Sequence, residues 1–231
     1  VLENVLKKFG FSSILKNKKI LITAGPTIEQ IDPIRAITNH SSGKTGVSLA
    51  AELVSAGAKV TFVYGPGKEK PPKGAKIINV LSSKEMHLAV KLELKKKLDI
   101  VIMAAAIADY VPTIQSKNKI KSSKSNMTIS LKKAPKIIDQ IKKYQKNVLL
   151  VGFKAEINLT KNQLIKSAEK KLKESSADMI IANDIGSIRY KKNPQKNQVI
   201  IVDSNKNIVS RWMDKEKIAK FIRKQIEVKI K

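Results

Sequence analysis

The chain has 231 residues, enough for one large domain or two small ones. Hydrophobic residues make up 42% and charged residues 28%, a globular balance. No apolar run approaches the roughly 20 residues of a membrane helix, the first residues do not look like a signal peptide, and the absence of cysteine excludes disulfides and thiolate metal sites. We therefore expect a cytoplasmic protein without a membrane partner.

The formal net charge of +27 attracts anions such as nucleic acids or phosphorylated small molecules. Nearly all of the basic residues are lysines, whereas direct reading of bases most often uses arginine. Aromatic residues, which form stacking platforms for single strands, are only 4% of the chain. A lysine-rich solvated surface is the first interpretation, an anionic small-molecule ligand the second, and a nucleic-acid partner the third.

Short, continuous apolar runs rich in β-branched residues recur along the first two thirds of the chain. Such runs are typical of strands that are buried on both faces of a parallel sheet. The predicted strands are 19–24, 59–64, 99–106 and 148–153, with a similar run at 178–182.

Amphipathic segments lie between these strands, and they predict helices at 43–57, 83–97 and 161–173. Gly57 occupies the position that usually follows a helix. Alternating strands and helices indicate an α/β fold with right-handed crossovers, a Rossmann-like, doubly wound and mostly parallel sheet with helices on both faces. The C-terminal part differs: 198–203 and 208–213 predict a hairpin, and a last helix is expected at 214–228 with Asp214 as its N-cap.

The predicted organisation is a short helix or linker at residues 1–16, from a possible upstream domain, followed by a single domain at 17–231. Residues 111–124 are polar and basic and directly follow a buried strand. A long basic loop in this position is either a mobile flap over a site or a surface decoration.

Ligands of open α/β sheets bind beyond the carboxyl ends of the strands. Gly25 follows the first predicted strand, and the loop 39–46 leads into the first helix. Its Gly43-Lys44-Thr45 resembles the end of a P-loop, but Thr38 stands where that motif needs its first glycine, and the loop begins more than ten residues after the strand. Ser41, Ser42 and Gly43 could expose amides to an anion at the helix N-terminus, although simple capping by a serine fits the spacing at least as well.

Other signals are weak. Gly65-Pro66-Gly67 lacks the third glycine of a dinucleotide fingerprint, so a reductase has little support. His40 could be catalytic, whereas His87 lies in a helical pattern. Asp109, beyond the third main strand, could accept hydrogen bonds from a ribose or merely cap a turn. Metal ligands cannot be assigned.

Seven stretches together resemble the phosphopantothenate–cysteine ligase family of coenzyme A biosynthesis. The runs 37–46 and 103–110 are its most specific parts, and the resemblance covers about residues 17–215. The stretches are ITAGPT (22–27), IDPIR (31–35), NHSSGKTG (39–46), MAAAIADY (103–110), KIK (119–121), VGFKAE (151–156) and AND (182–184).

The resemblance implies a ligase that joins 4′-phosphopantothenate to L-cysteine through an acyl-cytidylate, converting CTP to CMP and pyrophosphate with Mg²⁺. It also implies a homodimer. In prokaryotes the family is usually fused to a flavin-dependent phosphopantothenoylcysteine decarboxylase.

The family's site residues carry over to matching positions here. Asn39 matches the asparagine that handles the acyl-cytidylate, and Lys119 matches the first lysine of the family's flap motif. The implied nucleotide contacts are Met103, Ala104, Ala105, Asp109, Lys119, Pro135, Lys136, Ile137, Ile138, Phe153 and Lys171, and the implied phosphate contacts are Gly25, Ser41, Ser42 and Gly43.

Two positions depart from the family pattern. Ser122 and Ser175 stand where the family usually has lysine, with Lys124 and Lys173 nearby. Two alternatives to the ligase remain from the residues alone: a nicotinamide-dependent reductase on a similar sheet, and a basic nucleic-acid-binding protein.

Overall fold

The computed structural model describes residues 12–122 and 125–230, and its centre is an eight-stranded sheet in the order β13-β12-β10-β9-β6-β1-β4-β5. The strands from β10 to β5 are parallel to one another, and β12 and β13 add antiparallel strands at one edge. The predicted α/β fold is confirmed. The strands of this sheet are β1 (Lys19–Ala24), β4 (Lys59–Tyr64), β5 (Lys76–Asn79), β6 (Ile100–Met103), β9 (Leu149–Glu156), β10 (Met179–Asp184), β12 (Ile200–Val202) and β13 (Asn207–Val209).

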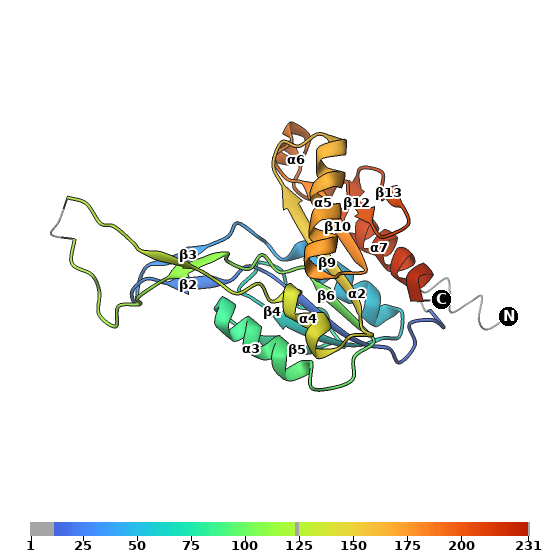
Figure 1. Cartoon of the computed structure of the whole chain (residues 1–231), viewed down its shortest axis with the longest axis horizontal. Helices are drawn as coiled ribbons and strands as arrows, with labels where there is room; N and C mark the ends of the chain where they lie inside the picture. Colours follow the sequence, from blue (N-terminus) through green and yellow to red (C-terminus); the bar gives the residue numbers. More distant parts are fainter. Residues whose placement is uncertain (1–11, 123–124, 231) are drawn as a thin grey trace.

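Helices cover both faces of this sheet (Figure 1). One hydrophobic core joins α2 and α7 to one face, and a second core joins α3, α4 and α5 to the other. No helix of the described residues is long and apolar enough to cross a membrane. The helices are α2 (Lys44–Ser55), α3 (Ser83–Glu93), α4 (Ile138–Tyr144), α5 (Lys161–Ser175), α6 (Ile188–Lys192) and α7 (Lys215–Ile230).

The two cores explain why the strand sequences are continuous apolar runs. Successive side chains of a strand point to opposite faces of the sheet. Ile20 and Ile22 therefore pack in the core that contains α2 and α7, whereas Leu21 between them packs against the other layer. A strand buried on both faces therefore consists mostly of apolar residues, and the buried Thr23 of β1 accepts a hydrogen bond from the Ala105 amide at 3.3 Å.

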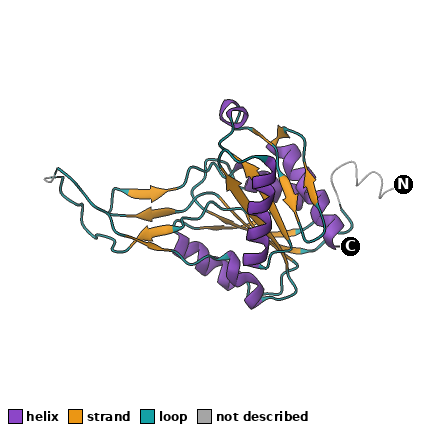
Figure 2. Cartoon of the chain, turned by 45° about the horizontal axis from the view of Figure 1, so that its top comes forward, coloured by secondary structure: helices purple, strands orange, loops and turns teal. Residues whose placement is uncertain are grey.

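Two short hairpins form an arm that projects from the body (Figure 1). We define the arm as the described residues of 28–38 and 110–133. Figure 2 shows that helices gather around the main sheet, while the far part of the arm consists of strands and loops. The strands of the arm are β2 (Ile28–Gln30), β3 (Ala36–Thr38), β7 (Tyr110–Pro112) and β8 (Leu131–Lys133); a separate small ladder pairs β11 (Lys196–Asn197) with β14 (Met213–Asp214).

Asp32 ties the two hairpins of the arm together. Its side chain is fully buried and accepts hydrogen bonds from the amides of Ile34 (2.9 Å), Arg35 (2.8 Å) and Ile120 (3.1 Å). The Arg35 guanidinium pairs with the same carboxylate at 3.0 Å and donates to the Ile120 carbonyl at 3.2 Å. One carboxylate thus orders the turn of the first hairpin and the loop of the second.

Most predicted elements are confirmed, with shifted ends. The strands 19–24 and 59–64 match the structure, and Gly57 follows α2 with a φ of 90°. The prediction 99–106 extends beyond the end of β6 at Met103, although the amides of Ala104 and Ala106 still donate to the carbonyls of Thr23 and Gly25 and an isolated bridge pairs Ala106 with Pro26. The helix predicted at 83–97 ends at Glu93, and most of the segment 1–16 lies outside the described residues.

Replacing Asp32 with alanine should loosen the arm without unfolding the body. The amides of Ile34, Arg35 and Ile120 would lose their acceptor, so their hydrogen exchange should accelerate by roughly tenfold or more. Exchange in β1 and β4 should stay unchanged, and Lys117→Ala, an exposed change on the same arm, serves as the control. Equal acceleration throughout the chain would contradict this role.

The same contact should also depend on pH. Burial alone would raise the pKa of Asp32, but the three amides and the Arg35 guanidinium together lower it below its ordinary value of 3.8. A lowered folded-state pKa contributes stability that is complete above the unfolded-state pKa and is lost as the pH falls through the folded-state pKa. Protection of the arm amides should therefore persist to about pH 4 and disappear only below it.

Candidate functional site

A cavity of about 1250 Å³ opens beyond the carboxyl ends of β1, β6, β9 and β10. Three segments meet there: 38–46, which leads into the first turn of α2, 103–109 from the end of β6, and 135–138, which leads into α4. The ends of β9 and β10 add Phe153, Glu156 and Asn183. This is the edge at which open α/β sheets bind their ligands, and the volume is large enough for a nucleotide together with a second substrate.

The N-terminus of α2 forms one wall of the cavity. Ser41 Oγ accepts from the Gly43 amide and Ser42 Oγ from the Lys44 amide, both at 3.3 Å. No side chain caps the helix itself, and within the described chain the amides of Thr45 and Gly46 have no acceptor. The interpretation that a serine caps this helix is therefore wrong: the N-cap is Gly43, the serines order the loop before it, and two further amides face the open end of the helix.

Close packing holds this wall in place. Gly43 has a φ of 80°, and a Cβ added to it would lie 2.8 Å from the Tyr64 hydroxyl. A Cβ on Gly46 would lie 2.3 Å from that of Ala24 at the end of β1. A Cβ on Gly65 would lie 1.8 Å from the Pro26 carbonyl oxygen, so this glycine serves the contact between two loops.

Asn39 and Asp109 line the same cavity. The Asn39 side-chain amide donates to the Ala106 carbonyl at 3.1 Å, which joins the loop before α2 to the loop after β6. The Asp109 carboxylate pairs with Lys136, and the backbone carbonyl of Asp109 accepts a hydrogen bond from the Ala134 amide at 2.8 Å. This pair joins the loop after β6 to the start of α4.

Lys171 completes the wall on the α4 side. Its ammonium pairs with Asp139 at 3.0 Å, and both side chains are partly exposed. Met103, Ala104, Ala105, Pro135, Ile137, Ile138, Phe153, Ser41, Ser42 and Gly43 also line the cavity, as does His40. His87 lies elsewhere, where it hydrogen-bonds to Gln140 at 3.1 Å between α3 and α4.

Several sequence-predicted residues do not line the cavity. Gly25 lies just behind it and acts through its backbone, accepting from the Ala106 amide at 2.9 Å. Lys119 lies on the arm beside Ile120, exposed and away from the cavity of its own chain. Ser175 is buried and donates to the Lys171 carbonyl at 2.6 Å. Ser122 is exposed, and Lys124 lies outside the described residues.

Sequence reasoning missed part of the lining. Lys170, not Lys173, stands beside Lys171 in the cavity. Lys44, Lys154 and Glu156 lie inside the stretches NHSSGKTG and VGFKAE, but no role was assigned to them. No motif marked the others: their lysines are a few among 46 basic residues, and Tyr190, Gln195 and Asn197 lie in the polar segment after β10. The missed residues include Lys44, Lys68, Lys154, Glu156, Lys170, Tyr190, Gln195, Asn197 and Lys215.

The acidic groups of the cavity are held by local partners. Burial alone would raise the pKa of Glu156, but the Ser167 hydroxyl at 2.5 Å and the Lys154 ammonium at 3.1 Å lower it. No group of three His, Asp or Glu side chains among the described residues could hold a metal ion. The cavity is thus a cationic chamber whose carboxylates position lysines.

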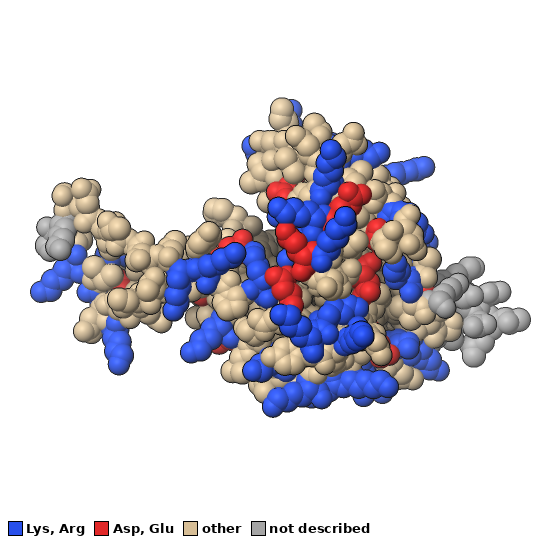
Figure 3. Space-filling view, in the orientation of Figure 1, with Lys and Arg blue, Asp and Glu red and all other residues tan. Residues whose placement is uncertain are grey.

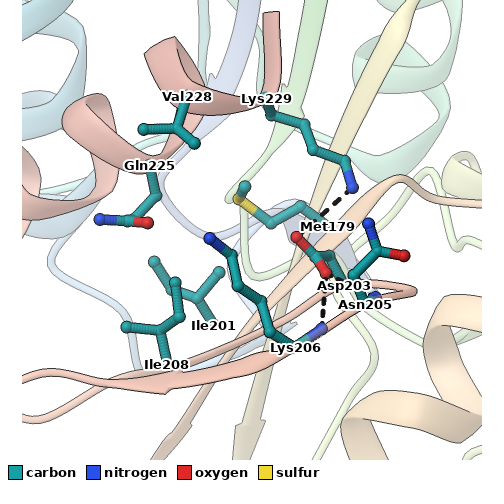
Figure 4. A pocket seen from close by; sticks show the side chains of 9 residues that line it. All are labelled: Met179, Ile201, Asp203, Asn205, Lys206, Ile208, Gln225, Val228 and Lys229. Atoms are coloured by element: carbon teal, nitrogen blue, oxygen red, sulfur yellow. Dashed lines mark hydrogen bonds and ion pairs between the residues drawn. The ribbon is translucent and has the colours of Figure 1, made fainter.

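A second, smaller hollow of about 150 Å³ lies between the β12–β13 hairpin and the end of α7 (Figure 4). Asp203 there accepts from the amides of Asn205 (2.8 Å) and Lys206 (3.0 Å) and pairs with Lys229 at 3.3 Å. The Asp203 carboxylate therefore stabilises the hairpin and its contact with α7.

Figure 3 shows basic side chains spread over both the body and the arm on the face that it presents. A duplex-binding protein gathers its basic residues into a patch or stripe. The spread on this face fits the interpretation of a lysine-rich solvated surface.

The family model described as DNA/pantothenate metabolism flavoprotein C-terminal domain matches residues 15–229 of this chain. The chain belongs to this family. It is 41% identical to the coenzyme A biosynthesis bifunctional protein CoaBC of Borreliella burgdorferi over 226 residues, which are 97% of this chain and 56% of that protein. The chain spans about half the length of the curated relatives that it matches.

Solved structures agree with the fold. The C-terminal domain of a CoaBC bifunctional protein has a TM-score of 0.78 and 36% identity, and the match covers 95% of this chain and 98% of that one. The Cab2 mutant H337A in complex with phosphopantothenate-cysteine has a TM-score of 0.74 at 17% identity, covering 99% and 94%. The resemblance inferred from the sequence is confirmed, and neither the reductase nor the nucleic-acid alternative finds support in these matches.

Gly43→Ala should disturb both the fold and the cavity. The left-handed backbone would cost about 1–2 kcal/mol with a Cβ, which lowers Tm by roughly 2–8 °C in a chain of this size. Thermal unfolding measures the change, and Ser55→Ala at the exposed far end of α2 is the control. An unchanged Tm would contradict the packing described for the start of α2.

Proposed function

We propose that this chain joins 4′-phosphopantothenate to L-cysteine in coenzyme A biosynthesis, through an acyl-cytidylate formed from CTP. The observation that carries the proposal is the convergence of Asn39, the Asp109–Lys136 pair and the open start of α2 on one cavity. The similarity to CoaBC proteins and to the C-terminal domain of one of them supports it. We propose that the reaction takes place in the cytoplasm.

In the first step, a carboxylate oxygen of phosphopantothenate attacks the α-phosphorus of CTP. A P–O bond forms, the bond to the β-phosphate breaks, and its electron pair leaves with pyrophosphate. Both reactants are anions, so the step needs positive charge and donors already in place more than a strong acid or base. Lys136, Lys171 and the amides at the start of α2 line the space in which this charge develops.

In the second step, the amine of cysteine attacks the acyl carbon, the amide bond forms, and the C–O bond to CMP breaks. The amine loses its proton to solvent. Asn39 can donate to the mixed anhydride without competing as a nucleophile, because a side-chain amide carries no charge. Its bond to the Ala106 carbonyl orients the side chain toward the loop that also carries Asp109.

Magnesium fits this site as part of the substrate. Mg²⁺ keeps several waters and is usually bound through substrate phosphates with one or two carboxylates. The described residues offer isolated carboxylates and no three-ligand group. We propose that Mg²⁺ arrives with CTP and is held mainly by phosphate oxygens.

We further propose a homodimer that forms through the arm. Its exposed apolar side chains include Ile34 and Ile114, which are 63% and 82% exposed, together with Tyr110, Met127 and Leu131. Exposed apolar surface in such a projection is typical of an interface. A second copy would also supply what one chain lacks, because Lys119 does not reach the cavity of its own chain. Fusion or association with a decarboxylase, as in the bifunctional relatives, is part of the same proposal.

Pyrophosphate release tests the ligase directly. With CTP, Mg²⁺ and 4′-phosphopantothenate, the chain should release pyrophosphate, and adding cysteine should produce CMP and the amide. ATP in place of CTP tests the nucleotide preference. Failure to release pyrophosphate from either nucleotide would contradict the proposed function.

Asn39→Ala is the matched variant for the same assay. It should still release pyrophosphate and let the acyl-cytidylate accumulate, because the lost amide acts on the intermediate. If pyrophosphate release stops instead, Asn39 acts in the first step and the assignment is wrong.

Mixed subunits test the arm. Lys119→Ala and Asn39→Ala chains should each make little amide alone. A mixture should regain partial activity, because a heterodimer that shares its arms contains one site with both residues intact. A mixture as inactive as its components would show that Lys119 serves its own chain or no site, and monomers in sedimentation would contradict the dimer.

A further inference from the structure

The start of α7 places a lysine at the wall of the cavity formed by α2. The Lys215 amide donates to the Gln195 carbonyl at 3.2 Å, and the short β11–β14 ladder precedes it. The Lys215 residue is only 6% exposed, yet it lines the cavity. The backbone thus places a buried cationic side chain at the wall of this cavity.

The ammonium of Lys215 has no anionic partner within 4 Å in the described chain. The neighbouring Lys44 takes the local acceptors instead, with Glu216 at 3.1 Å and Gln195 at 2.7 Å. The Lys215 ammonium lies over the Tyr190 ring, 5.6 Å from its centroid. A buried charge without a partner is costly, and a ligand of opposite charge would remove the cost.

Electrostatics around Lys215 point the same way. Burial and the charge of Lys44 lower the pKa of Lys215, and the carboxylates of Glu69 and Glu216 only partly oppose them. An anion placed beside it would raise this pKa and stabilise the charged form. The requirement for negative charge follows from geometry and burial, and the pKa direction agrees with it.

The free amides of Thr45 and Gly46 belong to the same cavity. A helix N-terminus carries a partial positive charge and offers N–H donors to an anion. Amides in fixed directions and an ammonium on one wall suit a phosphate group, which has several acceptor oxygens.

We propose that Lys215, together with the Thr45 and Gly46 amides, binds a phosphate group of a substrate. The identity of that substrate rests on the proposed function, which offers two sources: the terminal phosphates of CTP and the 4′-phosphate of phosphopantothenate. Lys136 and Lys171 come with α4 and α5, which pack on the other face of the sheet from α2 and α7, so the cavity has cationic groups from both layers for two anionic groups.

Calorimetry with the full chain tests the proposal, using inorganic pyrophosphate and 4′-phosphopantothenate as separate probes. Lys215→Met should weaken binding of one probe by roughly tenfold to a hundredfold, the loss expected for a hydrogen bond between charged groups. Loss for pyrophosphate assigns the residue to CTP, and loss for phosphopantothenate assigns it to the 4′-phosphate. Lys220→Met, an exposed change on the same helix, should leave both affinities unchanged.

Thermal unfolding of Lys215→Met without ligand separates binding from a structural role. Methionine has a similar shape without the charge, so Tm should hold or rise while affinity falls. Should the variant fail to fold, acetylation of the wild-type chain followed by mass spectrometry gives the second test. A bound probe should slow the acetylation of Lys215 and leave that of Lys220 unchanged.

Unchanged affinity for both probes in Lys215→Met would overturn the inference. So would a wild-type chain that binds neither probe, or acetylation of Lys215 that ignores both. A chain that releases pyrophosphate from CTP with Lys215 uninvolved keeps the proposed function and loses this inference. A chain that binds a probe through Lys215 but makes no acyl-cytidylate keeps this inference and loses the proposed function.

Discussion

The start of α2 is packed against the end of β1 and the aromatic ring at the end of β4, with no space for side chains at Gly43 and Gly46. Everything on the α2 side of the cavity depends on this contact, because it fixes the direction of the helix and of its free amides. The same contact brings the loop that carries Asn39 next to Ala106, and so next to the loop that carries Asp109. A side chain at either glycine would separate these groups.

Charge supplies the second constraint. The cavity is lined by at least seven lysines, among them Lys68, Lys154 and Lys215, but by only three carboxylates, Asp109, Glu156 and Glu174. Asp109 pairs with Lys136 and Glu156 with Lys154. These two carboxylates position lysine side chains and are not arranged as metal ligands. Such a chamber is poor as an acid–base site and well suited to two phosphorylated substrates. Self-repulsion among its lysines costs stability that bound anions would restore.

The sequence predicted β1, β4, β6, β9 and β10 because burial on both faces leaves a continuous apolar pattern, whereas β5, whose ends are exposed, was not predicted. Asn39, Asp109 and the start of α4 were found through the order of motifs, and the structure brings them into one cavity. The arm was not predicted as strands, since β2, β3, β7 and β8 have three residues each and their pairing depends on the buried Asp32.

Lys215 illustrates what sequence could not show. It is one lysine among many in a helical pattern, and only the fold reveals that it is buried without an anionic partner. Lys119 is the opposite case. Its motif is clear in the sequence, but the structure places it on the arm, outside the cavity of its own chain. Both differences arise because burial and distance are set by contacts between segments far apart in the chain.

The most direct test of the central claim is a crystal structure of the chain grown with CTP, Mg²⁺ and 4′-phosphopantothenate in the absence of cysteine. The account predicts an acyl-cytidylate in the cavity, its acyl-phosphate beside Asn39 and its nucleoside on the side of Asp109 and Lys136. A nucleotide bound outside this cavity, or one whose phosphates lie away from both α2 and Asn39, would contradict it.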